Sequence, residues 1–170
     1  QSIANAALHS NDVIKVFNKA VADVGAVLNL DMVRIFLFDR ETSTLNPKAQ
    51  FARITAGCPV TYPIRLGEAI VQMVAASGES AIFENTGEES FFAGFHQSRT
   101  TGQYPCGFFA ALPIRGNLNH SGALVCINRR PRELSAIESN FLGAVVGPVT
   151  MALDYFRLSE SLGSGERELP

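Results

Sequence analysis

The sequence predicts an α+β domain built on an antiparallel sheet, and three observations lead to this prediction. Apolar residues recur three and four positions apart near both ends of the chain, which is typical of amphipathic helices. Short β-branched and aromatic runs lie between those ends. Several of these runs are joined by polar turns, so the chain predicts a helix, two strands, a helix, a strand, a long loop, two strands and a final helix.

Composition and charge narrow the classes of protein. The 170 residues suffice for one domain with its own core, and 46% of them are hydrophobic and 18% charged. Lysine and arginine number 14 against 16 acidic residues, a net charge of −2 with no basic block. Nucleic acids and anionic membranes need a concentrated positive face, and no apolar run approaches the roughly 18 residues that span a bilayer. We therefore expect no nucleic acid and no membrane as partner.

The three cysteines indicate the cellular compartment in which the protein works. Cys58, Cys106 and Cys126 are odd in number, and none lies at a metal-binding spacing from another. We expect no disulfide framework and no metal site. Reduced thiols of this kind are typical of the cytoplasm.

The first elements predicted are a helix and a hairpin. Residues 13–28 carry an apolar stripe, and Ser10, Asn11 or Asp12 could cap its start. "MVRIFLFD" at 32–39 is a strand with both faces largely apolar, so it should be central in the sheet. "DRETST" supplies turn residues, and a more polar strand returns over 45–55.

The middle of the chain predicts a short helix and three strands. "LGEAIVQMVAASG" at 66–78 should be helical, with Gly78 as its C-terminal cap. We expect its inner face to consist of Ala69, Ile70, Met73 and Val74. A short strand at 80–85 precedes a long aromatic loop, and strands at 108–114 and 122–130 are joined by a polar turn.

The last helix opens with a capping box formed by Ser135 and Glu138. Gly147-Pro148 should kink it by removing one backbone hydrogen bond. It carries two apolar stripes: Ile137, Phe141, Ala144, Pro148, Met151, Tyr155, Leu158 and Leu162, and beside them Leu142, Val145, Val149, Ala152 and Phe156. One stripe suffices to pack on a sheet, so the second indicates a partner helix. A single wide buried face is the alternative.

These motifs together resemble a GAF domain, a sensory module related in fold to PAS domains. The resemblance rests on "VRIFLFD" at 33–39, "IRLGEAIVQMVAASGES" at 64–80, "AALPI" at 110–114, "GALVCINR" at 122–129 and "LSAIESNFL" at 134–142. It covers most of residues 8 to 158. It implies an α+β fold with the N- and C-terminal helices on one face of a central antiparallel sheet, and a ligand pocket with a lid on the other.

A motif of the cyclic-nucleotide-binding members is only partly kept. Asn128-Arg129, Leu134 and Glu138-Ser139 occupy the places of its Asn-Lys, Phe and Asp-Glu. The replacements preserve an ion pair from Arg129 to Glu138, which would hold the last helix to the last strand. The motif supports the fold and says little about cyclic nucleotides.

The resemblance implies a regulatory, small-molecule-sensing domain of a bacterial-type signal-transduction protein. Residues 1–160 would form the sensory domain, and 161–170 a linker toward a covalently joined output domain. The domain would form a homodimer through the helices at 8–29 and 134–162. A structural dimerisation domain with a filled pocket is the alternative.

The resemblance also places the ligand pocket. Residues 85 to 107 would form a lid, and a pocket of this kind is apolar with a few placed polar groups. The expected pocket and lid residues are Arg53, Ile70, Met73, Phe91, Phe92, Phe95, His96, Arg99, Tyr104, Cys106 and Phe108. Arg53 and Arg99 could hold an anionic ligand through their planar guanidinium groups.

No cofactor or catalytic residue is assigned. His96 could ligate haem iron, but no second ligand lies near it at metal spacing, so a role in bracing the loop is preferred. A bilin attached through Cys106 is disfavoured because Gly107, and not His, follows it. One GAF lineage reduces methionine sulfoxide through cysteines, yet "RLGEA" has none and Cys106 does not fit its lid motif. We therefore expect that the domain is not an enzyme.

Overall fold

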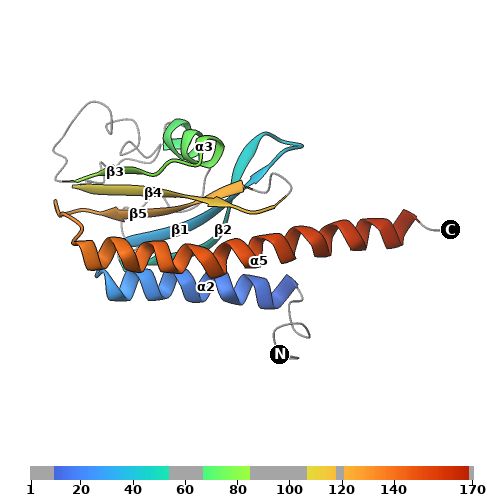
Figure 1. Cartoon of the computed structure of the whole chain (residues 1–170), viewed down its shortest axis with the longest axis horizontal. Coiled ribbons are helices and arrows are strands. Elements are labelled where there is room, and N and C mark those ends of the chain that lie inside the picture. Colours follow the sequence, from blue (N-terminus) through green and yellow to red (C-terminus); the bar gives the residue numbers. More distant parts are fainter. Residues whose placement is uncertain (1–9, 54–66, 85–106, 118–120, 169–170) are drawn as a thin grey trace.

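The computed structural model describes residues 10–53, 67–84, 107–117 and 121–168. The order of elements is the one expected from the sequence, and the fold is α+β. The elements are helix α2 (Ser10–Val27), strands β1 (Met32–Asp39) and β2 (Thr44–Ala52), helix α3 (Gly67–Ser77), strands β3 (Ala81–Phe83), β4 (Phe108–Arg115) and β5 (Ser121–Asn128), and helix α5 (Ala136–Glu168). Figure 1 shows them along the chain.

The five strands form one antiparallel sheet in the order β2-β1-β5-β4-β3. β1 lies between β2 and β5, as its two apolar faces predict. β2 is an edge strand, which accommodates Pro47 because an edge position can lack one ladder hydrogen bond. The register of β1 against β2 shifts between Ile35 and Phe36, so Lys48 is an extra residue on β2.

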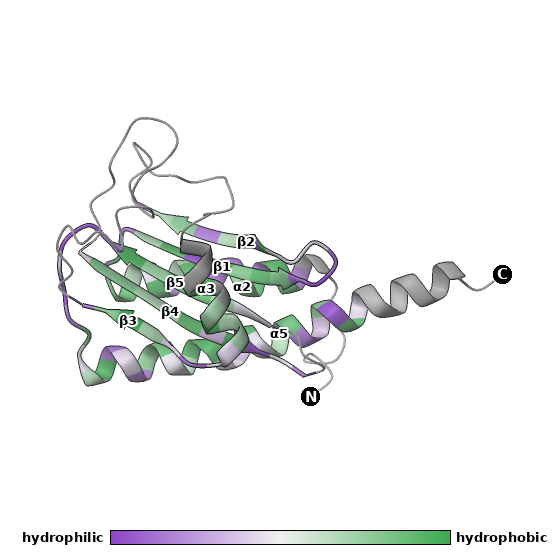
Figure 2. Ribbon diagram, turned by 90° about the horizontal axis from the view of Figure 1, so that it is seen from above, coloured by the Kyte–Doolittle hydropathy of each residue, from purple (hydrophilic) through white to green (hydrophobic). Residues whose placement is uncertain are grey.

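Helices α2 and α5 cover one face of the sheet, which we call the helix face (Figure 1). Its core contains the alternate β1 residues Val33, Ile35 and Leu37 together with Phe17 of α2 and Leu142 of α5. All five side chains are buried. Figure 2 shows the mostly hydrophobic strands that this packing requires.

Helix α3 covers part of the opposite face, which we call the α3 face, over β4 and β5. Val71, Val74 and Ala75 are its buried residues, and they pack with Phe109 and other apolar side chains of the sheet. Met73 is 69% exposed, so the inner face predicted for this helix was wrong at that position. The helix presents its 71, 74 and 75 positions to the sheet instead.

The predicted capping box at the start of α5 is confirmed. The Ser135 amide donates to the Glu138 carboxylate at 3.0 Å, and the Glu138 amide donates to the Ser135 hydroxyl at 3.1 Å. The helix then continues without interruption through Pro148 to Glu168. Its stripe of Leu142, Val149, Ala152 and Phe156 is buried against the rest of the domain.

The ion pair that holds the start of α5 involves a different arginine from the one predicted. Glu138 binds the guanidinium of Arg132, which also donates to the carbonyl of Leu28 at the end of α2. We had expected Arg129 in this role. The amide of Arg129 instead donates to Asp31 at 2.7 Å, which keeps this residue at the end of β5, whereas Arg132 lies in the segment that enters α5.

Candidate functional site

The α3 face contains a buried charge. Arg34 of β1 is 2% exposed and is the one buried polar or charged residue in the described part of the chain. Arg34 is two residues from both Met32 and Phe36, so its side chain points to the same face of the strand as theirs. Those two side chains belong to the core under α3. The cross-strand neighbour of Arg34 on β5 is Val125, another member of that core. A guanidinium group therefore lies within an otherwise apolar layer.

Burial of Arg34 has a physical consequence. An ionised side chain loses its hydration when it is buried, and the cost is several kcal/mol unless an anion or several hydrogen-bond acceptors replace the water. A strand that serves only to pack the core carries apolar side chains on its buried faces and does not incur this cost. The α3 face is therefore chemically different from a plain core. The signal in the sequence was the arginine between apolar residues in "MVRIFLFD", a stretch interpreted from the sequence only as a central strand.

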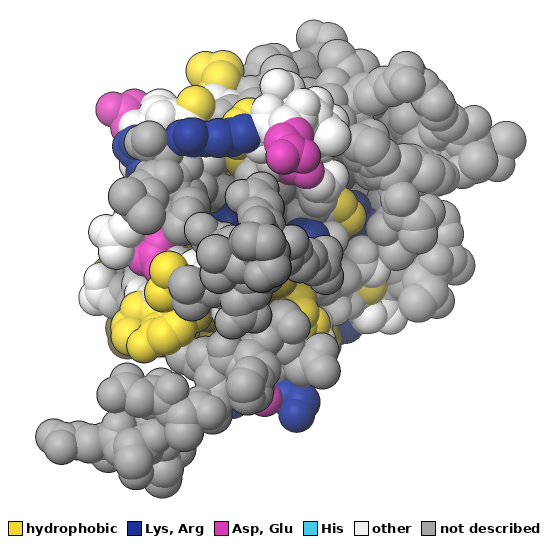
Figure 3. Space-filling model, turned by 90° about the vertical axis from the view of Figure 1, so that its right-hand side faces the viewer, with side chains coloured by type: hydrophobic (Ala, Val, Ile, Leu, Met, Phe, Trp, Pro, Cys, Tyr) yellow, Lys and Arg dark blue, Asp and Glu magenta, His cyan; other side chains and the backbone are white. Residues whose placement is uncertain are grey.

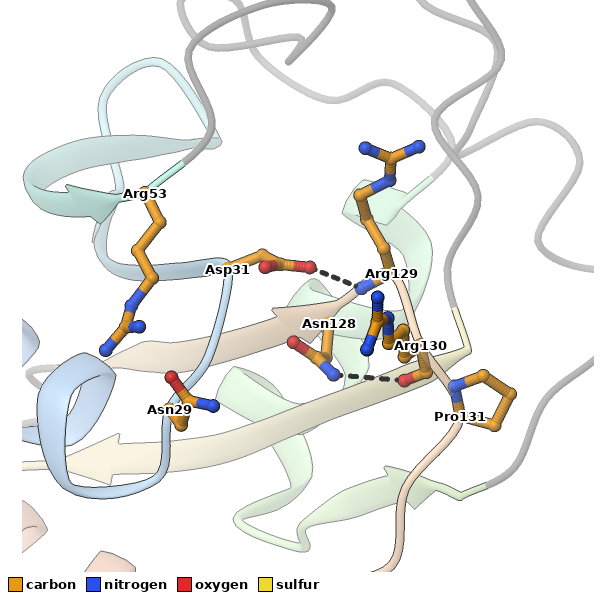
Figure 4. A pocket seen from close by; sticks show the side chains of 7 residues that line it. All are labelled: Asn29, Asp31, Arg53, Asn128, Arg129, Arg130 and Pro131. Carbon is orange, nitrogen blue, oxygen red and sulfur yellow. Dashed lines mark hydrogen bonds between the residues drawn. The ribbon is translucent and has the colours of Figure 1, made fainter.

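A pocket opens at one end of the sheet, where α2 leads into β1 and where β2 and β5 end. It has a volume of about 570 Å³, and Figure 4 shows its lining. We call it the sheet-end pocket. The described residues that line it are Asn29, Asp31, Arg53, Asn128, Arg129, Arg130 and Pro131.

The turn after α2 shapes one side of this pocket. Asn29 has φ 54°, the left-handed conformation that ends many helices, and Asn tolerates it better than most residues. The Leu30 amide donates back to Gly25 at 3.0 Å, which closes the turn. The chain then enters β1 through Asp31.

Asp31 joins the strand ends around the pocket. Its carbonyl accepts from the Arg53 amide at 2.9 Å, and its carboxylate accepts from the Arg129 amide at 2.7 Å. On the other side, the Asn128 side chain donates to the Arg130 carbonyl at 3.0 Å. These bonds keep the backbone of β1, β2 and the β5 end in a defined arrangement (Figure 4).

Three arginines give the pocket its charge. The Arg53 guanidinium lies over the Phe51 ring, 5.8 Å from its centroid, and donates to the Gly25 carbonyl at 3.5 Å. Arg129 and Arg130 are exposed and project from the chain after β5. Among the described lining residues, three therefore carry a guanidinium group and one, Asp31, carries a carboxylate. The Arg53 and Arg129 side chains point in different directions (Figure 4).

The predicted pocket and lid residues are not all in one place. Arg53 lines the sheet-end pocket, Met73 is exposed on α3, and Phe108 is buried on the helix face near Arg132. The prediction for Phe108 is corrected, because its neighbour Phe109 is the residue that faces α3. The side chain of Ile70 and all of Phe91, Phe92, Phe95, His96, Arg99, Tyr104 and Cys106 lie outside the described residues.

Cys126 is the one cysteine among the described residues. Cys126 is fully enclosed in the helix-face core, and burial raises the pKa of its thiol to about 12, with Arg132 opposing the shift. A thiol with this pKa is almost entirely protonated at neutral pH and so is a poor nucleophile. Within the described ranges, His, Cys, Asp and Glu form no group that could hold a metal ion.

The outer side of α5 is apolar and exposed. Ile137 is 82% exposed, Met151 64% and Leu158 52%, and all three belong to the first stripe predicted for this helix. A Cβ atom added at Gly143 or Gly147 would meet nothing within 4 Å, so this side is open. Figure 3 faces the end of the molecule toward which α5 runs and shows hydrophobic side chains at that surface.

Helix α5 is also the one described helix that is long and apolar enough, over Ala136–Ser159, to cross a membrane by length and composition. We had expected no such segment from the sequence. Part of this apolar content packs the domain, because Leu142, Val149 and Leu153 are buried on the helix face. The remainder forms the exposed stripe.

The chain matches the GAF domain family over residues 12–153. It belongs to that family. Solved GAF structures agree with the fold: that of an Acinetobacter phosphoenolpyruvate-protein phosphotransferase aligns with a TM-score of 0.68 at 18% identity, covering 86% of this chain and 84% of the other. At this identity the likeness concerns the fold.

Two further solved structures with a similar fold are named for other properties. The free methionine-R-sulfoxide reductase from Neisseria meningitidis aligns with a TM-score of 0.65 at 11% identity, covering 93% of this chain and 86% of that one. The PixJ GAF domain of Thermosynechococcus elongatus, in its blue-light-absorbing form, aligns with a TM-score of 0.60 at 15% identity, covering 94% and 96%. No curated protein matched the sequence. At these identities the comparisons establish the GAF fold alone.

Proposed function

We propose that this chain is the regulatory sensor domain of a cytoplasmic signalling protein. A small molecule binds on the α3 face, two copies pair through α2 and α5, and α5 carries the signal to a linked output domain. Such coupling requires that the ligand bind one arrangement of the paired helices more tightly than another.

The structure of α5 is the observation that carries this proposal. The helix starts against the sheet and runs to Glu168, well past the body of the domain (Figure 1). In the outer stripe Ile137, Met151 and Leu158 are exposed, whereas Phe141 and Tyr155 are partly buried against the helix-face core. Apolar residues at alternating steps of four and three are the pattern by which two helices pack along their length. A second copy of this chain offers the matching stripe.

Arg34 supports the sensing part of the proposal. Arg34 is the one buried charged residue among those described, and a guanidinium in a layer that excludes water is suited to bind an anionic or hydrogen-bonding group. Among the described residues, those buried on the helix face are all apolar, so no buried charge lies in that core. The α3 face is therefore the better candidate for the ligand.

We expect no enzymatic activity. The one described cysteine, Cys126, is enclosed and has a raised pKa, so it is unsuited to the thiolate chemistry of a sulfoxide reductase. Assay of the purified chain with free methionine sulfoxide and a thiol reductant should show no turnover above the uncatalysed rate. Turnover that persists in a Cys126→Ala variant would assign the activity to the other cysteines and overturn this part of the proposal.

Dimerisation is tested with two exposed methionines. Met151→Glu adds a charge to the exposed stripe of α5, and Met73→Glu adds the same charge to α3, where the side chain is equally exposed. We expect Met151→Glu to weaken the dimer at least tenfold by sedimentation analysis, and Met73→Glu to leave it unchanged. A wild-type monomer at about 10 μM, or a Met151→Glu dimer as tight as wild type, would contradict the model.

Ligand binding is tested by native mass spectrometry of freshly purified protein. We expect the wild-type chain to carry an additional small-molecule mass and Arg34→Met to lose it. Arg40→Met removes an exposed charge in the β1–β2 turn and should retain the adduct. A wild-type chain of bare mass, or an adduct that survives Arg34→Met, would count against sensing on the α3 face.

A further inference from the structure

The sheet-end pocket lies apart from both parts of the proposed function. Its described lining comes from the strand ends and the turns beside them, whereas Arg34 lies within β1 on the α3 face and the exposed stripe lies on α5. Arg53 was predicted to hold the sensed ligand and lines this pocket, whereas Arg129 and Arg130 were given no ligand-binding role. We propose that this pocket binds a small anion that carries phosphate or carboxylate groups.

The charge of the lining is the first argument. Arg53, Arg129 and Arg130 contribute three permanent positive charges, and Asp31 contributes one negative charge. The Asp31 carboxylate already accepts the Arg129 amide at 2.7 Å. Among the described lining residues the guanidinium groups outnumber the carboxylates, and this favours an anionic ligand.

The geometry of the donors is the second argument. A guanidinium presents five N–H donors in a planar fork that matches a carboxylate or phosphate. The Arg53 guanidinium is placed by the Phe51 ring and by the Gly25 carbonyl, so less of its freedom is lost when a ligand binds. Asn29 and Asn128 add amide groups to the lining for hydroxyl or carbonyl groups of the ligand.

Size and shape distinguish a small molecule from a protein segment. A volume of about 570 Å³ lies within the range of small-molecule sites. The backbone around it is held by the bonds of Asp31 to the ends of β2 and β5, so part of the site is formed before the ligand arrives. A concave, partly preformed basic pocket fits a compact anion better than an extended acidic peptide.

The position of the pocket links it to the helices. Arg130 is two residues before Arg132, which binds both the Leu28 carbonyl of α2 and the Glu138 carboxylate of α5. Asn29 is the residue directly after Leu28. An anion in the pocket therefore contacts the two segments that lead to the ends of α2 and α5, and can favour one arrangement of those ends over another.

The test is a calorimetric titration of the whole 170-residue chain with pyrophosphate and, separately, with citrate, at constant ionic strength. The double variant Arg53→Gln/Arg130→Gln removes two of the charges at exposed positions. The matched control Lys15→Gln/Arg40→Gln removes two exposed charges on α2 and in the β1–β2 turn. We expect wild type and the control to bind at least one of the two anions equally, and the pocket variant to bind at least tenfold more weakly.

Four outcomes would overturn the proposal. No heat of binding at millimolar pyrophosphate or citrate would mean that the pocket is not an anion site. Equal weakening in both double variants would show general charge attraction only. Full binding by the pocket variant, or its loss in Arg34→Met, would place the anion elsewhere, the latter on the α3 face. Binding of pyrophosphate alone or of citrate alone identifies phosphate or carboxylate as the recognised group.

Discussion

The helix face and the α3 face are built from the same strands but bury different chemistry. Val33, Ile35 and Leu37 of β1 meet α2 and α5 in a core that is apolar throughout the described residues. The intervening residues Arg34 and Phe36 face the other way, and one of them is charged. Successive side chains of a strand point to opposite faces, so one segment can serve both layers.

We propose that this difference separates the face that stabilises the domain from the face that binds the ligand. The helix face is covered by two long helices along the sheet, and hydrophobic burial there can supply most of the folding free energy. The described part of the α3 face has one short helix, the exposed side chain of Met73, and a buried cation. Substitutions on the first face should therefore act on unfolding, and several substitutions on the second should act on binding.

The largest effect is expected on the helix face. Phe17→Ala removes a fully buried ring between α2 and the sheet and should lower the free energy of unfolding by about 3–5 kcal/mol. Val27→Ala, on the same helix but 62% exposed, should change it by less than about 0.5 kcal/mol. Urea unfolding at one protein concentration measures both. Similar losses for the two variants would contradict the assignment of the α2 core.

A smaller contrast is expected on α3. Val74→Ala should cost about 2 kcal/mol because the side chain is buried against the sheet, whereas Met73→Ala should cost less than about 0.5 kcal/mol. The same urea measurement applies. If Met73→Ala lowered the free energy of unfolding more than Val74→Ala, α3 would pack on the sheet with the side predicted from the sequence and not with the side described here.

The start of α5 contributes a pH-dependent term. The Ser135 amide hydrogen bond and the Arg132 guanidinium lower the pKa of Glu138, against a smaller opposing effect of burial. Its contribution to stability is therefore complete above the pKa of glutamate in the unfolded chain, and it is lost as pH falls through the lower folded-state pKa.

Glu138→Gln should accordingly lower the free energy of unfolding at pH 7 by about 1 kcal/mol. This difference should shrink once the wild-type carboxyl is protonated, at pH values below its lowered pKa. Urea unfolding of both proteins between pH 7 and 3 provides the check. A deficit that stays constant over this range would mean that the charge of Glu138 contributes nothing.

The smallest effect is expected on the outer side of α5. Gly143→Ala should raise the stability of the monomer by about 0.5–1 kcal/mol, because alanine favours a helix and the new Cβ meets nothing. Gly25→Ala, in α2, should bring no such gain because its Cβ would lie 2.1 Å from the Phe51 ring. Thermal unfolding at concentrations below dimer formation separates the two. A loss at Gly143 under these conditions would show that this side of α5 is not open.

Local features were predictable because neighbouring residues determine them. The alternation of "MVRIFLFD" predicted a central strand, and β1 does lie between β2 and β5. Ser135 and Glu138 are three residues apart and form the capping box whatever the remaining fold does. The outlines of the helices and of the hairpin follow from patterns of the same range.

The choice between equivalent faces needed the tertiary structure. Both stripes of α5 are apolar, and only packing on α2 and the sheet decided that Leu142 and Val149 are buried while Met151 is exposed. The same holds for Phe108 and Phe109, which are adjacent aromatic residues on opposite faces. Strand register assigns these faces, and a shift of one residue would exchange them.

The sequence by itself determined the order and type of the elements, because hydrogen bonding and apolar periodicity act over a few residues. Only the tertiary structure decided that Arg132, and not Arg129, binds Glu138. It also buried Arg34 and brought Arg53 and Arg130 to one pocket, although 76 positions separate these two arginines in the chain. These contacts depend on which strand ends lie together at one end of the sheet, and no local sequence pattern determines that.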